Sequence, residues 1–364
     1  MKTTFLIGNG FDLNLGFRTK YSDFFDAYLS KNMEHPTPGI ERFRKGLIGS
    51  PAYWSDLELA LGRFSENFND ETEYIEVLEH IQDELSLYFK NLDLKIIIDN
   101  DERIKAMNYL ANFDEYFTEK DRRDFLDFKR RNDMSSNEIY IISFNYTSSI
   151  ETIYDWRGRF QHFKSSSLAV QNSNIPCKLY TIEHVHGTFK NNMLLGVNDQ
   201  TQITNTRFQN SKQIIRSIVK PEMNINTESL RETRCVKMIN TADVICIFGM
   251  SLGETDKFWW EKIGEHLLIS DSKLVIFAIH EALPPLRAYK TINIKEKIQD
   301  KFLSYLSYTD EDKERIRQRI IVCLNSSMFK IMPISKHDEL LKSAAVLSKQ
   351  LEKINQQIPD MRIR

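Results

Sequence analysis

Four short stretches of the chain combine glycine with polar side chains that could bind or activate a ligand. They are GNGFD at residues 8–12, SFNYT at 143–147, HG at 186–187 and GMSL at 249–252. Each follows an apolar run typical of a buried strand, so each is expected at the carboxyl end of a strand. Ligands of open α/β sheets bind in the crevice beyond those ends. Together the four stretches predict one shared site.

Each stretch has a functional interpretation and a structural one. Gly8 and Gly10 form a turn that could bring backbone N–H groups to a phosphate, or an ordinary βα turn that needs glycine for its backbone alone. Asn145 could hold a ligand or cap a helix, and Ser251 has the same two interpretations. His186 could act as a base or be a hydrogen-bonded core histidine.

A metal site is a separate hypothesis. His184 and His186 lie two residues apart on a predicted strand and are therefore expected on one face, where they could join Asp12 and Glu58 around a metal ion. The H-x-H spacing alone is a weak signal. Asp12 could also hold its own turn, and Glu58 completes a capping box that begins at Ser55.

The elements that position these residues are mostly strands of a parallel sheet. Runs such as VICIF and LVIFAI are apolar at consecutive positions, which is typical of strands covered on both faces. We therefore expect an α/β fold with a mostly parallel sheet and helices on both faces. The predicted strands are Thr3–Ile7, Ile139–Phe144, Tyr180–Val185, Leu194–Val197, Val244–Phe248, Leu274–Ile279 and Arg319–Leu324.

Helical periodicity dominates the region between the first two predicted strands. Apolar stripes recur in ETEYIEVLEHIQDELSLYF and IKAMNYLANFDEYF, so we interpret residues from about 40 to about 135 as a large helical insertion. We expect an α/β domain over residues 1–290 and a mainly helical C-terminal segment over 291–364. The segment after residue 285 contains many lysines and glutamates.

Composition narrows the functional classes. The 364 residues carry a formal net charge of −2, which argues against nucleic acid as a partner. Basic residues between Arg122 and Arg131 are interpreted as a solvated helix face. The four cysteines show no C-x-x-C pair, and no stretch approaches the roughly 20 apolar residues of a membrane span. We expect a cytoplasmic protein without a membrane partner.

Six stretches, found in order along the chain, resemble the AbiH family of proteins associated with abortive infection by bacteriophage. They are LIGNGFDLNLGFRTKYSDF, WSDLE, SFNYTSSIE, HVHGTF, LGVND and FGMSLGETDKFWW. The resemblance extends from residue 6 to about residue 260. It implies antiviral defence, with a phage-derived trigger and a homo-oligomeric state as further expectations, although the sequence shows no coiled-coil heptad.

More distantly, the same order of motifs resembles the sirtuin-type NAD-binding fold, which is Rossmann-like. The GNGFD, GFR, SFNYT, HG and GMSL stretches take the places of five sirtuin motifs. On this resemblance Asn145 holds the nicotinamide-side ribose and His186 acts as base on its hydroxyls. The remaining cofactor-binding residues would be Gly8, Asn9, Gly10, Asp12, Arg18, Ser143, Gly249 and Ser251.

The departures from the sirtuin pattern argue against protein deacylation. Asp12 and Thr147 replace a serine and an aspartate of the motifs, and the four-cysteine zinc ribbon is absent. Sirtuin-like domains of bacterial phage defence resemble NAD hydrolases instead, so the resemblance implies an NAD glycohydrolase, with NAD as substrate and no metal expected. A metal-dependent nuclease or phosphohydrolase and a non-catalytic nucleotide-binding sensor of infection remain the alternatives.

Overall fold

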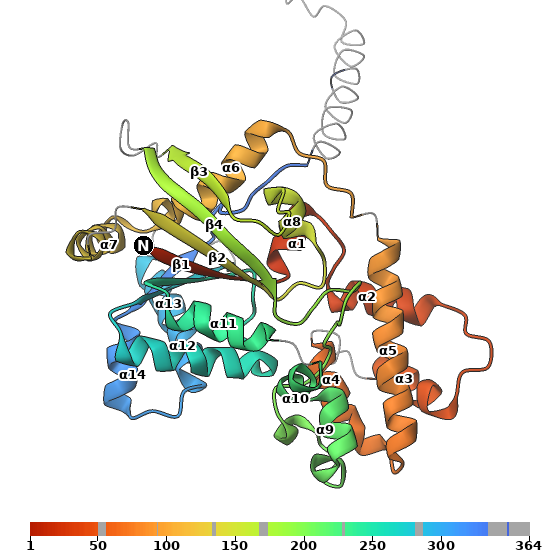
Figure 1. The fold of residues 1–364 in the computed structure, drawn as a ribbon. Coiled ribbons are helices and arrows are strands. Elements are labelled where there is room, and N and C mark those ends of the chain that lie inside the picture. The colour runs from red at the N-terminus through yellow and green to blue at the C-terminus, as the bar shows by residue number, and fades with distance from the viewer. Residues whose placement is uncertain are drawn as a thin grey trace, which may run out of the picture.

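The computed structural model describes residues 1–49, 56–92, 94–132, 136–166, 174–227, 230–280, 287–333 and 348. Its centre is a seven-stranded sheet in the order β3-β4-β2-β1-β5-β6-β7 (Figure 1). All neighbouring strands are parallel except β3 and β4, which are antiparallel. The strands are β1 (Lys2–Ile7), β2 (Asn137–Ser143), β3 (Gln161–Ser166), β4 (Asn174–His184), β5 (Val244–Phe248), β6 (Lys273–Ala278) and β7 (Ile320–Leu324).

The mostly parallel sheet confirms the interpretation of the consecutive apolar runs. All five residues of β5 are buried, as expected for a strand covered on both faces. The predicted strand Leu194–Val197 is wrong. This segment is buried in the core of the helical lobe described below, and only Val197 forms an isolated bridge, to Val219. Strand β3 carries no apolar run and was not predicted.

Fourteen α-helices surround the sheet in the described ranges. They are α1 (Gly10–Leu15), α2 (Tyr21–Ser30), α3 (Pro38–Gly49), α4 (Leu57–Phe64), α5 (Glu71–Asn91), α6 (Asn100–Ala111), α7 (Glu119–Arg131), α8 (Ser149–Tyr154), α9 (Lys212–Ile218), α10 (Lys220–Asn226), α11 (Arg231–Asn240), α12 (Lys257–Ile269), α13 (Ala288–Ser304) and α14 (Asp310–Arg317). None of them is long and apolar enough to cross a bilayer.

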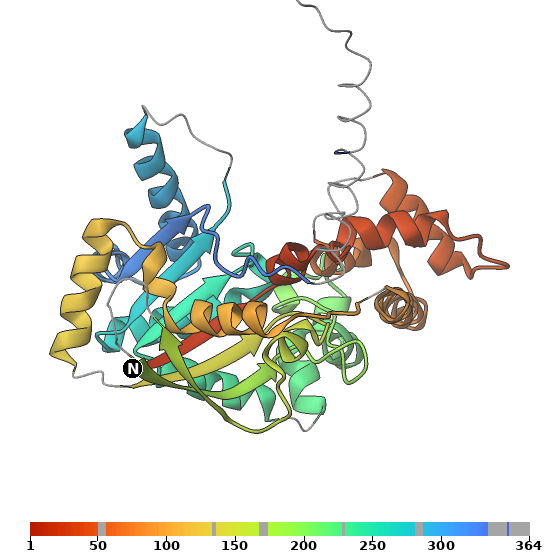
Figure 2. The same cartoon turned by 90° about the horizontal axis from the view of Figure 1, so that it is seen from above.

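Helices cover both faces of the sheet, as expected. On one face, α6, α7 and α8 pack on β1 and β2 through a core that includes Phe113 and Phe125. On the other face, α11 to α14 pack through a second core around Trp260 and Ile263 (Figures 1 and 2). The C-terminal part of the described chain contributes β7 to the edge of the sheet.

A third hydrophobic core belongs to a helical lobe beside the sheet. It joins α2 to α5 with α9 and contains Phe43, Tyr74 and Ile81 (Figure 1). The residues from about 40 to 135 therefore divide between two places, because α3 to α5 form this lobe whereas α6 and α7 cover the sheet. The lobe lies beyond the carboxyl ends of the parallel strands, which places its residues next to the predicted site.

Candidate functional site

The loops after β1 and β5 meet at the point where the strand order reverses. Strand β1 lies between β2 and β5. Strands β2 to β4 extend the sheet on one side of β1, and β5 to β7 extend it on the other. The N–H of Gly8 donates to Phe248 O at 2.9 Å, and the N–H of Gly10 donates to Gly249 O at 2.8 Å. Gly249 has a φ of +68°. The two amide hydrogens expected at a phosphate are thus bonded to the neighbouring loop.

Gly10→Ala is expected to lower the free energy of unfolding by about 1–3 kcal/mol, as overpacking does elsewhere. A Cβ on Gly10 would lie 2.4 Å from Gly249 Cα, which is backbone and cannot move alone. The measurement is urea denaturation beside Gly253→Ala, whose Cβ would meet nothing closer than 3.7 Å. Equal losses in the two variants would contradict the close contact between the loops.

A cavity of about 150 Å³, here called the His186 cavity, opens beside these loops. Five of the ten residues proposed from the sequence line it, and three carboxylates and three aromatic rings complete most of its wall. The predicted residues are Gly8, Asn9, His186, Gly249 and Ser251; the carboxylates belong to Asp56, Glu58 and Asp256; the rings belong to Tyr21, Phe144 and Tyr146.

His186 is buried and electrically neutral at physiological pH. Burial disfavours its charged form and the nearby Lys220 ammonium repels a further proton, so the pKa of His186 falls to about 3 although Asp256 opposes the shift. Its Nε2 lies 3.8 Å from Asp256 Oδ1, and its ring meets Phe144 edge-on at 5.2 Å between centroids. The imidazole can therefore accept a hydrogen bond from a ligand hydroxyl.

Lys220 joins the buried Glu58 carboxylate and the partly buried Asp256 carboxylate behind this histidine. Its Nζ donates to Glu58 Oε2 and to Asp256 Oδ1, each at 2.9 Å. The side chains of Lys220 and Glu58 are 5% and 7% exposed, so solvent screens this pair little. Burial raises the pKa of Glu58 to about 7 against the attraction of Lys220, and Asp256 raises it further. Burial also disfavours ionised Asp256, but the Lys220 charge outweighs it and lowers the Asp256 pKa.

Sequence analysis missed Lys220 and Asp256 as site residues. Asp256 follows the predicted GMSL turn by only four residues, and that proximity was the available signal. Nothing near Lys220 in the sequence distinguishes it from a surface lysine. Glu58 was considered only for a metal or a capping box; the observed cap of α4 is Asp56, which accepts from Leu59 N–H, and Ser55 lies outside the described residues.

A second cavity of about 80 Å³, here called the Asn145 cavity, adjoins the first. Both cavities are lined by Asn9, Tyr21, Phe144 and Tyr146, so these four side chains form the wall between them. Asn145 is 4% exposed, and neither its Oδ1 nor its Nδ2 makes a hydrogen bond within 3.5 Å in the described residues, although the amide lies close enough to the Asp12 carboxylate to lower the pKa of that group. The structure thus places Asn145 and His186 in neighbouring cavities rather than in one.

Two other predicted residues, Asp12 and Ser143, hold the loops around the Asn145 cavity. Asp12 accepts hydrogen bonds from Thr147 Oγ1 at 2.6 Å and from Ser149 Oγ, which ties the β1 loop to the β2 loop. Burial raises the pKa of Asp12 although these hydrogen bonds lower it. Ser143 Oγ accepts from the Asn145 N–H at 3.2 Å. Arg18 lines neither cavity and instead pairs with Asp23 at 3.4 Å.

His184 lies apart from His186 and has different partners. Strand β4 ends at His184, so the expectation that both histidines share one strand face is wrong. His184 Nδ1 donates to Asn145 O at 2.8 Å, and Nε2 donates to Glu151 Oε1 at 2.5 Å. Because both nitrogens face acceptors, these contacts favour the imidazolium form of His184. In the described part of the chain, no three His, Cys, Asp or Glu side chains are grouped to hold a metal ion.

The contribution of His184 to stability is expected to decrease as the pH rises. Burial lowers its pKa, but the Glu151 hydrogen bond and charge outweigh burial and raise it above the usual 6.5. A raised folded-state pKa gives stability that is fully present below pH 6.5 and is lost as the pH rises through the folded value. The difference in unfolding free energy between the native chain and His184→Asn should therefore shrink above that pH.

His80→Asn is the control for this pH dependence. Burial lowers the pKa of His80, so its contribution should change in the opposite direction with pH. Urea denaturation over a pH series measures both differences. A difference for His184→Asn that does not vary with pH would contradict the imidazolium assignment.

All residues that line the His186 cavity or the Asn145 cavity fall between Gly8 and Asp256. No curated protein sequence matches the chain. A family model described as bacteriophage abortive infection AbiH matches residues 4–278, which include both cavities, most of β1 and strands β2 to β6. Because that match covers well over half of the 364 residues, the chain belongs to the AbiH family of bacteriophage abortive infection proteins.

Proposed function

We propose that this AbiH-family protein acts in phage defence by hydrolysing the bond between nicotinamide and ribose in NAD, on a Rossmann-like sheet of the sirtuin type. The order of the parallel strands supports this fold, because it reverses between β1 and β5. Dinucleotides bind doubly wound sheets at such a reversal, beyond the carboxyl ends of the strands. The His186 cavity lies beside the loops that leave those two strands.

The unpartnered amide of Asn145 carries the proposal. Leaving a buried polar group without a hydrogen bond costs about 1–3 kcal/mol, so such a group suits a ligand that completes its bonding. The Asn145 amide offers one acceptor and two donors, and the nicotinamide end of NAD carries both donors and acceptors. The surrounding wall includes Tyr21, Phe89, Phe144 and Tyr146, whose rings suit a flat heterocycle.

The charge of the His186 cavity also suits cleavage of the bond between nicotinamide and ribose. Three carboxylates line it, with Lys220 as the ammonium that pairs with two of them. The pyridinium nitrogen is cationic before cleavage and the oxocarbenium-like transition state carries positive charge on the ribose, so acidic surroundings stabilise both. Neutral His186 would accept a hydrogen bond from a ribose hydroxyl. The same acidity repels a diphosphate, which we expect to lie outside this cavity.

The reaction would break the bond between the anomeric carbon and the pyridinium nitrogen, with the electron pair leaving on nicotinamide. Water then forms the new bond to that carbon and releases a proton. Volumes of about 150 and 80 Å³ leave room for the nicotinamide and ribose portion rather than for the whole dinucleotide. Metal-assisted hydrolysis has less support, because Lys220 Nζ already lies between the Glu58 and Asp256 carboxylates.

The test is to incubate purified protein with NAD, with and without EDTA, and to measure released nicotinamide by chromatography. NAD is also measured in bacteria that express the chain, before and after phage infection. We expect NAD loss that EDTA does not prevent. Binding of NAD without turnover in both settings would instead identify a sensor, and intact NAD without binding would exclude NAD as the substrate.

A further inference from the structure

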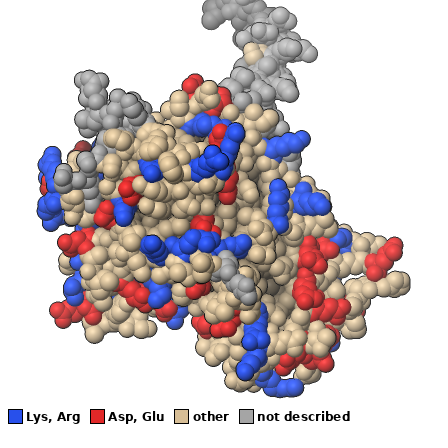
Figure 3. Space-filling view, viewed as in Figure 1, with Lys and Arg blue, Asp and Glu red and all other residues tan. Residues whose placement is uncertain are grey.

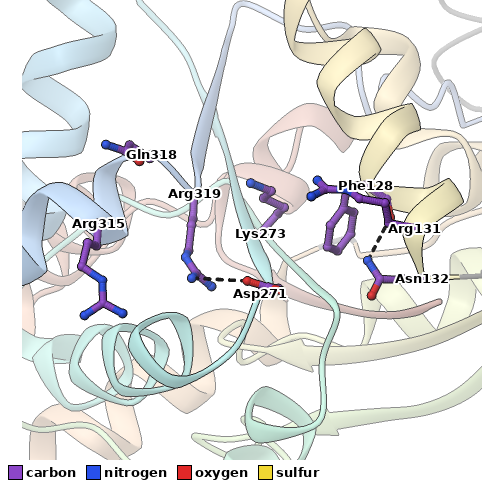
Figure 4. A pocket seen from close by; sticks show the side chains of 8 residues that line it. All are labelled: Phe128, Arg131, Asn132, Asp271, Lys273, Arg315, Gln318 and Arg319. Carbon is purple, nitrogen blue, oxygen red and sulfur yellow. Dashed lines mark hydrogen bonds and ion pairs between the residues drawn. The ribbon is translucent and has the colours of Figure 1, made fainter.

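Another cavity lies at the other end of the sheet. It has a volume of about 520 Å³ and is lined by the C-terminal end of α7, the segment entering β6 and the segment between α14 and β7 (Figure 4). Lys273 is the first residue of β6, and Arg319 immediately precedes β7. This cavity, here called the basic cavity, is therefore at the amino ends of the parallel strands, away from the cavities of the candidate site.

Positive charge exceeds negative charge in the basic cavity. Arg131, Lys273, Arg315 and Arg319 line it, against the single carboxylate of Asp271. Arg319 pairs with Asp271 at 3.4 Å. Arg131 and Lys273 have no ion-pair partner within 4.0 Å among the described residues, although Asp271 and Asp124 are close enough to Lys273 to oppose part of the lowering of its pKa.

Arg315 is already paired, with Asp312 at 3.2 Å. We therefore expect Arg315 to contribute less to anion binding in this cavity than Arg131 and Lys273.

The cationic groups are close enough to repel one another. Partial burial lowers the pKa of Lys273, and the charges of Arg319 and Arg131 lower it further. Arg319 Nη1 is buried and has no hydrogen-bond partner in the part of the chain that the structure describes. Figure 4 shows Lys273 and Arg131 beside the Phe128 ring, with Arg319 paired to Asp271 on the other side of Lys273. An anion between these groups would relieve their repulsion and satisfy the free donor.

We propose that the basic cavity binds a small polyanion that carries two or three linked phosphate groups. Arginine guanidinium groups bind phosphate oxygens in pairs of parallel hydrogen bonds, and lysine adds a point charge. A volume of about 520 Å³ is in the range of small-molecule sites. The buried Phe128 ring lies in its lining. This proposal does not depend on the activity proposed above.

A long polynucleotide fits the observations less well. Affinity for nucleic acid depends on many Lys and Arg contacts along the phosphate backbone. The chain has a net charge of −2, and Figure 3 shows basic and acidic side chains interspersed on the face viewed, with acidic ones gathered over α5. The Lys and Arg side chains of the basic cavity are grouped in one place rather than spread along the surface, which favours a compact ligand.

The experiment is calorimetric titration of the full chain with inorganic tripolyphosphate, with sulfate at matched ionic strength as reference. We expect saturable binding of one ligand per chain, weakened about tenfold or more by Arg131→Gln and further by Arg131→Gln combined with Lys273→Gln. Arg130→Gln is the matched control, because Arg130 is exposed on the same helix and pairs with Asp127. It should change the affinity less than about twofold.

Three results would overturn the proposal. They are no saturable binding up to about 1 mM, an equal effect of Arg130→Gln and Arg131→Gln, and tighter binding of a short DNA duplex than of tripolyphosphate. Arg131 is exposed at the end of α7, so its single variant is expected to keep the fold even where Lys273→Gln does not. Circular dichroism of each variant confirms that folded protein is titrated.

Discussion

His186→Ala is expected to reduce the rate of the proposed NAD cleavage by about 10²- to 10³-fold, the order of loss when one preorganised hydrogen bond in an active site is removed. The neutral imidazole faces the cavity, and its only ion-pair approach in the described structure is to Asp256 at 3.8 Å. Asn145→Ala should cause a loss of similar size by removing the unpartnered amide. Released nicotinamide is the readout, and circular dichroism verifies the fold.

Matched controls separate these effects from a general loss of folded protein. His162→Ala and Asn226→Ala replace exposed residues of the same types, and both should retain the native rate. Retention of the native rate by His186→Ala or Asn145→Ala would contradict the assigned roles. A loss shared by the two controls would show that the assay responds to stability rather than to the site.

The pH profile distinguishes His186 from Glu58. The pKa of His186 is held near 3. Titration of His186 should therefore cause no change in activity around pH 6.5, where an ordinary histidine titrates. The pKa of Glu58 is about 7, and its ionised form would stabilise positive charge, so kcat/KM should rise with pH through about 7. Glu58→Gln should remove that rise. A rise that persists in Glu58→Gln would assign the titration to another group.

Lys220→Met is expected to lower the free energy of unfolding by about 3–5 kcal/mol, the largest stability effect anticipated here. Removing the ammonium leaves the Glu58 and Asp256 carboxylates close together in a buried cluster without a cation. Without that charge, burial would raise the pKa of Asp256 and raise that of Glu58 further. Urea denaturation near neutral pH measures the loss.

Lys31→Met is the control for the buried ammonium. Lys31 pairs with Glu84 at 2.6 Å, but its side chain is 44% exposed, so its removal should cost much less. Adding Asp256→Asn to Lys220→Met should recover part of the loss, because one buried carboxylate no longer needs a cation. Equal losses from the two lysine variants, without recovery in the double variant, would contradict the role given to Lys220.

The sequence by itself determined most of the parallel strands of the sheet. The strand Val244–Phe248 was predicted at its observed bounds, because a strand buried on both faces must be apolar at consecutive positions. The polar and glycine-rich stretches at residues 8–12, 143–147, 186–187 and 249–252 follow four of these strands. Parallel strands bring their carboxyl ends to one edge, so the general location of the site followed from local patterns.

The tertiary structure decided how the side chains at that edge are paired. Lys220 joins Glu58 and Asp256 across 162 and 36 residues of chain, and no local pattern reports such an ion pair. The packing of Gly10 against Gly249 is equally non-local. Sequence periodicity records which positions are buried, because burial favours apolar residues. It does not record which polar groups meet, since that depends on contacts between distant segments.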